Sequence, residues 1–291
     1  MRSFLFIPAD SEKKLAKGLD SGADALILDL EDSVAADRKP GARDTALAYL
    51  KQHAASAQRP RLVVRVNALD TGLTDADLDG VVAGRPDAIL LPKAEGGAAV
   101  IHLDAKLTAR EAIHDLPDGH IKIIALATET ASALFLCGTY REASPRLTGI
   151  TWGAEDLSAE LGSETNRDSN GRFTSPYMLA RNLSLAAAAS ARVQAIDTVY
   201  ADFRNSQGLR EEAIEARRDG FTAKMAIHPA QVAIINEVFT PTPQSIATAR
   251  AVVKAFADNP AAGVVAIGGV MYDRPHLTRA RRLLARAKDT H

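Results

Sequence analysis

The chain has 291 residues, a formal net charge of -1 and 46% hydrophobic residues, which is an ordinary globular composition with enough apolar residues for one large core. The near-neutral charge argues against nucleic-acid binding. The single cysteine excludes an intrachain disulfide framework and a cysteine-based metal site. Neither a signal peptide nor an apolar run of membrane-spanning length is present, so we expect a cytoplasmic protein that binds no membrane.

Short apolar runs alternate with helical stretches along the first 240 residues. The predicted strands are residues 4–7, 25–28, 62–66, 88–91, the apolar parts of 121–130 and 149–157, 195–200 and 223–227. The predicted helices are residues 11–18, 41–56, 75–82, 97–116, 131–142, 176–191 and 211–218. Continuous apolar runs are typical of parallel strands buried on both faces, and their alternation with helices predicts a (β/α)8 TIM barrel. No glycine-rich nucleotide-binding turn supports the rival doubly wound sheet.

Two regions lie outside this repeat. Residues 163–172 are rich in turn formers, and we predict a long loop over the rim of the barrel. After about residue 238 we expect an amphipathic helix over 245–258, a flexible apolar loop over 263–269 and a basic helix over 277–287. We therefore predict a catalytic barrel over residues 1–240 and a C-terminal helical extension over 241–291. The extension should pack on the barrel, on a neighbouring subunit or on both, which predicts a homo-oligomer.

Glu129 and Asp156 follow two successive predicted strands. The carboxyl ends of barrel strands meet at the rim where active sites lie, so the two carboxylates should lie side by side. Close carboxylates repel unless a cation binds between them, and Mg²⁺ takes one or two carboxylates together with substrate oxygens. We predict a Mg²⁺ site at this pair. The alternative is that each carboxylate caps the helix that follows it.

Arg65 ends the third predicted strand. A guanidinium in an apolar strand needs an anion, and its fork of N–H donors matches a substrate carboxylate. We favour substrate binding over the alternative, an intrachain salt bridge to Glu31 or Asp32.

Asp29, Glu31 and Asp32 follow the second predicted strand. One of them is a candidate general base, one a candidate partner that orients Arg65, and one a candidate metal ligand through water. The residue types alone do not assign these roles, and structural salt bridging is an equal alternative for each.

Four more residues have weaker patterns. Lys93 ends the fourth predicted strand, but a lysine beside a Mg²⁺ site is redundant as an electrophile, so we disfavour covalent chemistry there. His228 is either a ligand-positioning or a structural histidine. Trp152 and Cys137 are interpreted as packing residues.

With these residues in place, the chain resembles the citrate lyase β-subunit family of the HpcH/HpaI aldolase superfamily. The resemblance extends over nearly the whole chain in the expected order, and its motifs are specific as a set. They are residues 2–8 (RSFLFIP), 23–33 (ADALILDLEDS), 65–67 (RVN), 91–93 (LPK), 129–130 (ET), 152–157 (WGAEDL), 195–197 (AID) and 225–229 (MAIHP).

The resemblance implies a TIM barrel in which Glu129 and Asp156 hold Mg²⁺ and Arg65 binds the carboxylate of a 2-oxo acid. It implies that a carbon–carbon bond is cleaved or formed between that 2-oxo acid and an acetyl thioester carried on CoA or acyl carrier protein. The substrate would be a 3-hydroxyacyl thioester of the citryl, malyl or citramalyl type. We accordingly predict Arg65 and Glu129 as substrate-binding residues, and Arg65, Asp32 and Glu31 as catalytic residues.

The chain departs from the family pattern near its C-terminus. The thioester lyases are expected to carry Leu-Asp-Gly-Lys-Met there, whose Asp reaches a neighbouring subunit's site as an acid or base, but Gly268 stands at that position. A smaller departure is Ala9, where a glycine usually follows the proline. Two alternatives follow: a thioester-free Mg²⁺-dependent aldolase with Asp32 as base, and a non-catalytic or complex-dependent subunit.

Overall fold

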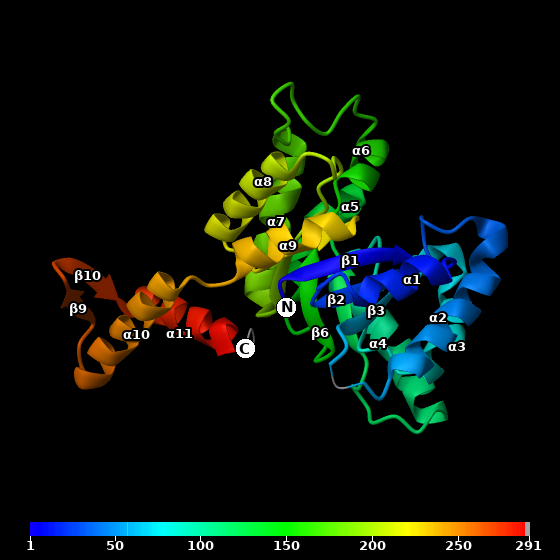
Figure 1. Cartoon of the computed structure of the whole chain (residues 1–291), viewed down its shortest axis with the longest axis horizontal. Helices are drawn as coiled ribbons and strands as arrows, with labels where there is room; N and C mark the ends of the chain where they lie inside the picture. Colours follow the sequence, from blue (N-terminus) through cyan, green and yellow to red (C-terminus); the bar gives the residue numbers. More distant parts are fainter. Residues whose placement is uncertain (57, 289–291) are drawn as a thin grey trace.

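Eight parallel strands close into a barrel in the computed structural model, which describes residues 1–56 and 58–288. The strands lie in chain order around the barrel, and the pairing of the first with the eighth closes it (Figure 1). They are β1 (Ser3–Pro8), β2 (Ala25–Asp29), β3 (Arg61–Arg65), β4 (Ala88–Leu91), β5 (Lys122–Leu126), β6 (Leu147–Thr151), β7 (Gln194–Asp197) and β8 (Ala223–Ala226). The predicted TIM barrel is confirmed.

Helices follow the strands in the order that the sequence predicts, with some differences at their ends. They are α1 (Glu12–Leu19), α2 (Lys39–His53), α3 (Thr74–Val81), α4 (Gly96–Ile113), α5 (Ala131–Leu136), α6 (Glu155–Leu161), α7 (Ser175–Ala191), α8 (Ser206–Asp219) and α9 (Pro229–Phe239). The helix predicted over 131–142 is shorter, because a 3₁₀ turn over Cys137–Tyr140 replaces its second half. Helix α6 was not predicted, and it places Asp156 in a first helical turn rather than directly at a strand end.

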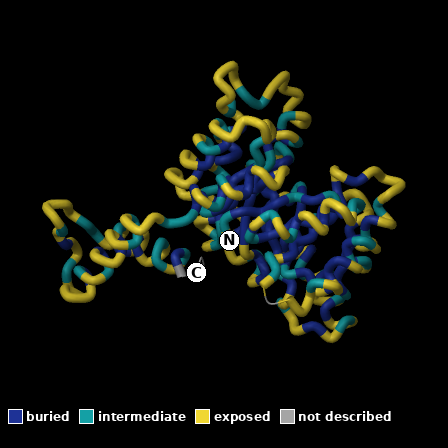
Figure 2. The backbone as a smooth tube through the Cα atoms, in the orientation of Figure 1, coloured by how far each residue is buried: buried dark blue, intermediate teal, exposed yellow. Residues whose placement is uncertain are grey.

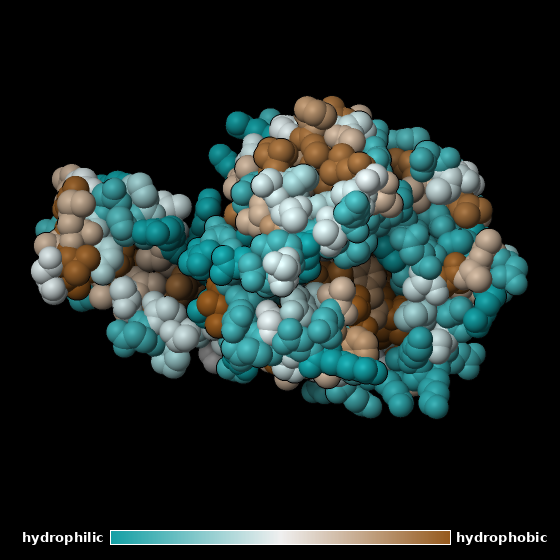
Figure 3. Space-filling view, turned by 90° about the horizontal axis from the view of Figure 1, so that it is seen from above, coloured by the Kyte–Doolittle hydropathy of each residue, from teal (hydrophilic) through white to brown (hydrophobic). Residues whose placement is uncertain are grey.

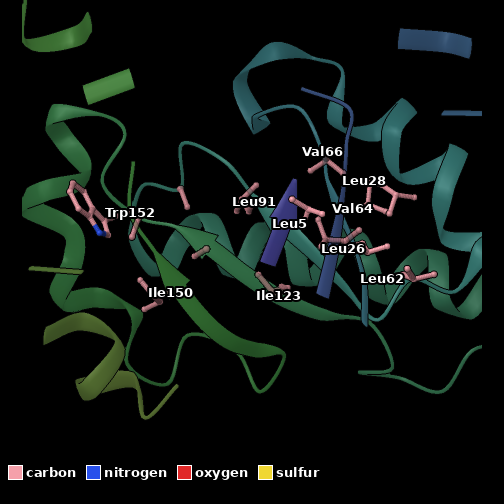
Figure 4. Close-up of a cluster of buried hydrophobic side chains, with 14 of the residues drawn as sticks. Leu5, Leu26, Leu28, Leu62, Val64, Val66, Leu91, Ile123, Ile150 and Trp152 are labelled. Carbon is pink, nitrogen blue, oxygen red and sulfur yellow. The ribbon is translucent and has the colours of Figure 1, made fainter. Parts of the chain in front are cut away.

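The strands read as continuous apolar runs because both of their faces are buried. Alternate side chains point to opposite faces of a strand. One set, which includes Phe4, Ile27 and Val63, fills the barrel interior. The other set packs between the strands and the surrounding helices, and Figure 4 shows part of it. The labelled members are Leu5, Leu26, Leu28, Leu62, Val64, Val66, Leu91, Ile123, Ile150 and Trp152.

The C-terminal region forms a small unit with a core of its own. It contains α10 (Pro243–Asp258), β9 (Val264–Ile267), β10 (Val270–Asp273) and α11 (Arg274–Lys288). Its buried apolar residues form a cluster separate from those of the barrel (Ala249, Val252, Phe256, Val265, Leu277 and Ala280). The unit projects to one side of the barrel and is mostly exposed (Figures 1 and 2). The last three residues of the predicted extension lie outside the described residues.

The prediction of a flexible loop over residues 263–269 is wrong. Strands β9 and β10 pair antiparallel through Ile267 and Val270, and Gly268 and Gly269 form the turn between them. Both glycines have positive φ angles, +58° and +81°, which tight hairpin turns require and which glycine adopts without a steric penalty.

None of the helices in the described part of the chain is both long enough and apolar enough to span a membrane.

Candidate active site

A cavity of about 430 Å³ opens at the carboxyl ends of the barrel strands. This is the size of a small-molecule site. Its lining includes Arg65, Glu129 and Asp156, so the structure brings together the three residues that the sequence analysis placed first. Asp29 and Asp32 also line the cavity, whereas Glu31 is not among its lining residues.

Glu129 and Asp156 are linked through Lys93. The backbone N–H of Lys93 donates to Oε2 of Glu129 at 2.6 Å, and its Nζ lies 3.1 Å from Oδ1 of Asp156. Glu129 is 3% exposed, and a side chain at Gly153 would collide with it, because a Cβ there would lie 2.8 Å from its Cγ. The absence of a side chain at residue 153 thus leaves room for the Glu129 carboxylate.

Burial raises the pKa of Glu129 to about 8, and the charge of Asp156 adds to the increase. Helix capping does not explain this carboxylate, since Thr130 is the N-cap of α5 and accepts a hydrogen bond from the N–H of Ala133. Asp156 lies in the first turn of α6, where an acidic residue is favourable, so the capping alternative holds in part for Asp156.

Arg65 is held in a rigid arrangement of carboxylates. Its Nε and Nη2 each donate to an oxygen of Asp29 at 2.7 Å, and its Nη1 lies 2.8 Å from Oε2 of Glu31. Nη1 also lies 3.7 Å from Oδ2 of Asp32, and the guanidinium stands over the Phe6 ring. The intrachain ion pair is therefore present, with Asp29 as its main partner, and the guanidinium still lines the cavity.

Glu31 and Asp32 have different surroundings. One oxygen of the buried Glu31 faces Arg65, and the other accepts from Nζ of Lys93 at 2.8 Å. Asp32 has a side chain that is 59% exposed, and it lines the cavity. Glu31 thus lies between two cations away from the cavity, whereas Asp32 is accessible to a ligand.

Lys93 is the residue whose importance the sequence analysis missed. Its ammonium joins Glu31 to Asp156, and its backbone has φ +48°, which is uncommon for a residue other than glycine. That conformation accompanies the N–H bond to Glu129. The sequence carries a signal for this role, because Lys93 lies two residues after the end of β4, at the same rim as Arg65.

A second buried charged cluster lies behind the cavity, on the face of the strands that packs against the helices. Asp197 accepts from Nε1 of Trp152 at 2.8 Å and from Nζ of Lys224 at 2.7 Å. Lys224 also pairs with Glu212 of α8 at 2.9 Å. Trp152 is therefore a hydrogen-bonded residue as well as a packing residue, and it fixes the end of β6 beside β7.

His228 and Cys137 have structural surroundings. Nδ1 of His228 accepts from the N–H of Ala230 in a capping box at the start of α9, and its ring stacks on Phe203 at 4.8 Å. Cys137 is buried. These contacts favour the structural alternative for His228 and the packing interpretation for Cys137.

In the described part of the chain, no group of three or more His, Cys, Asp or Glu side chains is arranged to hold a metal ion. The two carboxylates Glu129 and Asp156 instead suit a hard cation that completes its coordination with water and substrate oxygens. The raised pKa of Glu129 agrees with this chemistry, because a cation between the two carboxylates would relieve their repulsion.

Comparison with known proteins gives a consistent result. The family model described as HpcH/HpaI aldolase/citrate lyase matches residues 2–229. A (3S)-malyl-CoA thioesterase of Cereibacter sphaeroides is 38% identical over 99% of this chain and 94% of its own length. The citrate lyase subunit beta of Escherichia coli K12 is 35% identical over 99% of this chain and 93% of its own length.

Solved structures of CitE from Mycobacterium tuberculosis are similar over the barrel and beyond. The complex with magnesium, acetoacetate and coenzyme A has a TM-score of 0.77 and 34% identity, and covers 99% of this chain and 98% of that one. The complex with oxaloacetate and magnesium has a TM-score of 0.68 and 33% identity, and covers 82% and 96% of the two chains.

Proposed function

The chain belongs to the HpcH/HpaI aldolase/citrate lyase family, and from that premise we propose that it is a Mg²⁺-dependent carbon–carbon lyase acting on a 3-hydroxyacyl thioester. Its products would be a 2-oxo acid and an acetyl thioester, and the reverse reaction would join them. One observation carries the proposal: a preorganised guanidinium and two carboxylates, Arg65, Glu129 and Asp156, line one cavity.

Glu129 and Asp156 would hold the Mg²⁺. Two carboxylates at one rim, one of them buried with a pKa raised to about 8, form a donor set that a divalent cation stabilises. When bound, the cation polarises the oxo group of the acid as a Lewis acid. The magnesium complexes of the CitE neighbour support Mg²⁺ as the metal.

Arg65 would bind the carboxylate of the 2-oxo acid. Nε and Nη2 of Arg65 donate to Asp29, which fixes the plane of the guanidinium. The third nitrogen, Nη1, faces Glu31 and Asp32. A guanidinium fixed before the ligand arrives loses little conformational entropy on binding. Glu129 would act on the same ligand by helping to hold the cation.

Asp32 is the residue that we propose for proton transfer. Cleavage requires a base to take the hydroxyl proton as the carbon–carbon bond breaks, and the electron pair passes to the thioester as an enolate. A proton must then be returned to the enolate carbon to give the acetyl thioester. Asp32 is exposed and lines the cavity, whereas both oxygens of Glu31 face cations, so Glu31 would act as a positioning residue.

CoA is the thioester carrier that we propose, because the CitE neighbour binds coenzyme A and a 38% identical relative is named for malyl-CoA. We also propose a homo-oligomer. The C-terminal unit projects from the barrel (Figure 1), and its hairpin exposes Val264, Val270 and Met271, which a second copy would cover.

Thioester hydrolysis is a second candidate. The relative named a malyl-CoA thioesterase supports it, and so does Gly268, which has no side chain to return a proton to an enolate. In hydrolysis, water replaces the thiol at the thioester carbonyl and a free thiol is released. No enolate forms, so no group has to donate a proton to carbon.

The test measures the products separately. Full-length protein is incubated with malyl-CoA and citramalyl-CoA, with Mg²⁺ or with EDTA, and both the 2-oxo acid and the free thiol are followed. A lyase releases the oxo acid without thiol and only with Mg²⁺, whereas a hydrolase releases thiol without oxo acid. Free hydroxy-oxo acids are incubated in parallel, and oxo acid formed only from them would replace the proposal with a thioester-free aldolase. A Glu129→Gln variant, which removes one carboxylate, should lose the Mg²⁺-dependent activity.

A further inference from the structure

Thr151 is the last residue of β6, and it lines the active-site cavity. In the pairing of β5 with β6 it lies beside Leu126, whose side chain belongs to the cluster that fills the barrel interior. Register partners point to the same face of a sheet. The alternation along β6 agrees, because a Cβ at Gly149 would contact Ile124 and Ile196 of the same interior cluster. The Thr151 side chain therefore points into the barrel interior.

The hydroxyl of Thr151 is buried without a hydrogen-bond partner. The residue is 1% exposed, and no group in the described part of the chain bonds to its Oγ1. Among the described lining residues of the cavity, only Thr151 has a buried side-chain oxygen or nitrogen in this state. A buried hydroxyl without a partner lowers stability, and a valine of the same shape would avoid this cost. The fold therefore gives the hydroxyl no structural role, which indicates a ligand as its partner.

The position of Thr151 determines which ligand atom it meets. Arg65, the proposed carboxylate-binding residue, ends β3, whereas the proposed cation ligands Glu129 and Asp156 follow β5 and β6. A 2-oxo acid that spans these groups has its carboxylate toward β3 and its oxo oxygen toward β5 and β6. Thr151 ends β6, so its hydroxyl lies on the side of the oxo oxygen. A hydroxyl can donate one hydrogen bond, and a carbonyl oxygen accepts it.

We infer that Thr151 is a specificity-determining residue, whose hydroxyl donates a hydrogen bond to the oxo oxygen of the bound acid. It favours a 2-oxo acid over a carboxylic acid of the same size that lacks this oxygen. The ligand also supplies the partner that the described residues do not provide. This role rests on the proposed function, because it needs a 2-oxo acid in the cavity.

The test removes the hydroxyl and keeps the shape of the side chain. Full-length wild type, Thr151→Val and Thr151→Ser are titrated calorimetrically with pyruvate at saturating Mg²⁺. We expect Thr151→Val to bind pyruvate at least about fivefold more weakly, because the oxo oxygen loses a buried donor, and Thr151→Ser to stay within about twofold of the wild type. Unchanged pyruvate binding in Thr151→Val overturns the inference and leaves the proposed function intact. A wild type that binds no pyruvate removes the proposed function itself.

Propanoate shows which oxygen of the acid is bound. It has a methylene group in place of the oxo group of pyruvate, and its affinity is measured by competition with pyruvate. Propanoate should bind equally to the wild type and to Thr151→Val, because it has no oxo oxygen to lose a partner. An equal loss for both acids would place the hydrogen bond at the carboxylate and overturn the assignment to the oxo oxygen.

Thermal unfolding of the ligand-free protein separates this role from a structural one. Thr151→Val should raise the midpoint by about 2 °C, because it removes an unpartnered buried hydroxyl, whereas loss of a structural hydrogen bond would lower it. Thr128→Val is the matched control. Thr128 is 0% exposed and its hydroxyl also lacks a partner among the described residues, but it is not among the lining residues of the cavity. It should raise the midpoint similarly and leave pyruvate binding unchanged. A lower midpoint in Thr151→Val, or an equal loss of pyruvate binding in Thr128→Val, overturns the inference.

Discussion

Arg65 is a charged side chain on the inner face of a barrel strand, and its neighbours stabilise it there. Burial by itself would lower the pKa of Arg65, but the hydrogen bonds and charge of Asp29 raise that pKa overall. In return, Arg65 holds the pKa of Asp29 below its usual value although burial opposes this. The pair is charged at every physiological pH, which keeps the positive charge that the proposed binding of a substrate carboxylate requires.

The forked set of N–H donors on the Arg65 guanidinium should matter for 2-oxo-acid binding as much as its positive charge does. Arg65→Lys keeps the charge but cannot donate to both oxygens of Asp29 and also to a ligand. We expect 2-oxo-acid binding to weaken about tenfold to a hundredfold, the value of one lost charged hydrogen bond. Calorimetry with Mg²⁺ present measures it. Arg110→Lys, at a surface cluster with Asp75 and Asp79, is the matched control, and equal losses in both variants would contradict a specific role.

Glu129 should make metal binding dependent on pH. Its pKa in the folded protein, about 8, lies above its ordinary value, so the metal-free site keeps a proton at neutral pH. Mg²⁺ must displace that proton, so its affinity should rise from pH 6 to about pH 8, by at most about tenfold per pH unit, and then level off. Calorimetric titrations at several pH values test this. An affinity that stays flat over this range would show that Glu129 is already ionised.

The same shift affects the stability of the metal-free protein. A folded-state pKa above the unfolded one contributes stability below the unfolded value, and this contribution is lost as the pH rises through about 8. In EDTA, denaturation of the wild type should therefore become easier between pH 6 and pH 9, and Glu129→Gln should reduce this change.

At the scale of elements, the segment between β6 and α6 fixes the end of a strand and positions the two carboxylates Glu129 and Asp156. Trp152 anchors the end of β6 by its hydrogen bond to Asp197, and Gly153 follows with its backbone close against Glu129. Helix α6 then presents Asp156 from its first turn. A few consecutive residues thus fix the strand end, leave room for one carboxylate and supply the other.

Gly153→Ala should disturb the metal site while the barrel stays folded. The new Cβ would lie 2.8 Å from Cγ and 3.1 Å from Oε1 of Glu129, so the carboxylate must move. We expect Mg²⁺ affinity to fall at least about tenfold, as misplacement of a ligand commonly causes. Gly138→Ala is the matched control, because a Cβ there meets no atom within 4 Å. Unchanged Mg²⁺ binding in Gly153→Ala would show that the close contact is harmless.

At the scale of the whole molecule, the chain consists of a barrel and a projecting C-terminal unit. The hairpin of β9 and β10 exposes Val270 and Met271 by 54% and 61%. Figure 3 shows some brown atoms among teal and white ones on this projecting unit, and larger brown areas on the barrel. Exposed apolar side chains on a projecting unit are typical of a surface that a second copy covers.

Charges on the hairpin should dissociate the oligomer. The double variant Val270→Glu and Met271→Glu keeps the fold, since both side chains are exposed, but opposes burial of the hairpin. We expect sedimentation analysis to find a smaller particle than for the wild type. Gln244→Glu, at an exposed position of α10, adds charge elsewhere on the unit and should change nothing. An unaltered assembly in the double variant would place the interface elsewhere.

Gly268 tests whether a carboxylate from this unit takes part in catalysis. A Cβ at residue 268 meets no atom within 4 Å, and Asp tolerates a positive φ better than most residues. If the chain is a lyase that lacks an acid, Gly268→Asp should raise the rate of carbon–carbon cleavage about 10²-fold or more. Gly269→Asp, equally free of contacts, is the control. Equal rates in both variants would show that this carboxylate is not what limits the rate.

The sequence by itself determined the barrel and the residues at its rim. Strands buried on both faces must be apolar throughout, so a strand such as residues 25–28 was recognisable without any knowledge of its partners. Charged residues that follow such runs, above all Arg65 and Glu129, stood out for the same reason. The hairpin is also predictable from the sequence, because a Gly-Gly pair between two apolar runs, here Gly268 and Gly269, is a turn signal.

Only the tertiary structure decided which charges meet. Asp29 faces Arg65, and Lys93 joins Glu31 to Asp156, because the closed barrel brings the ends of different strands to one rim. Strand alternation likewise turns Asp197 and Lys224 toward the helices rather than into the cavity. Local sequence sets which segments are strands, but contacts between residues far apart in the chain depend on how the strands pair and tilt.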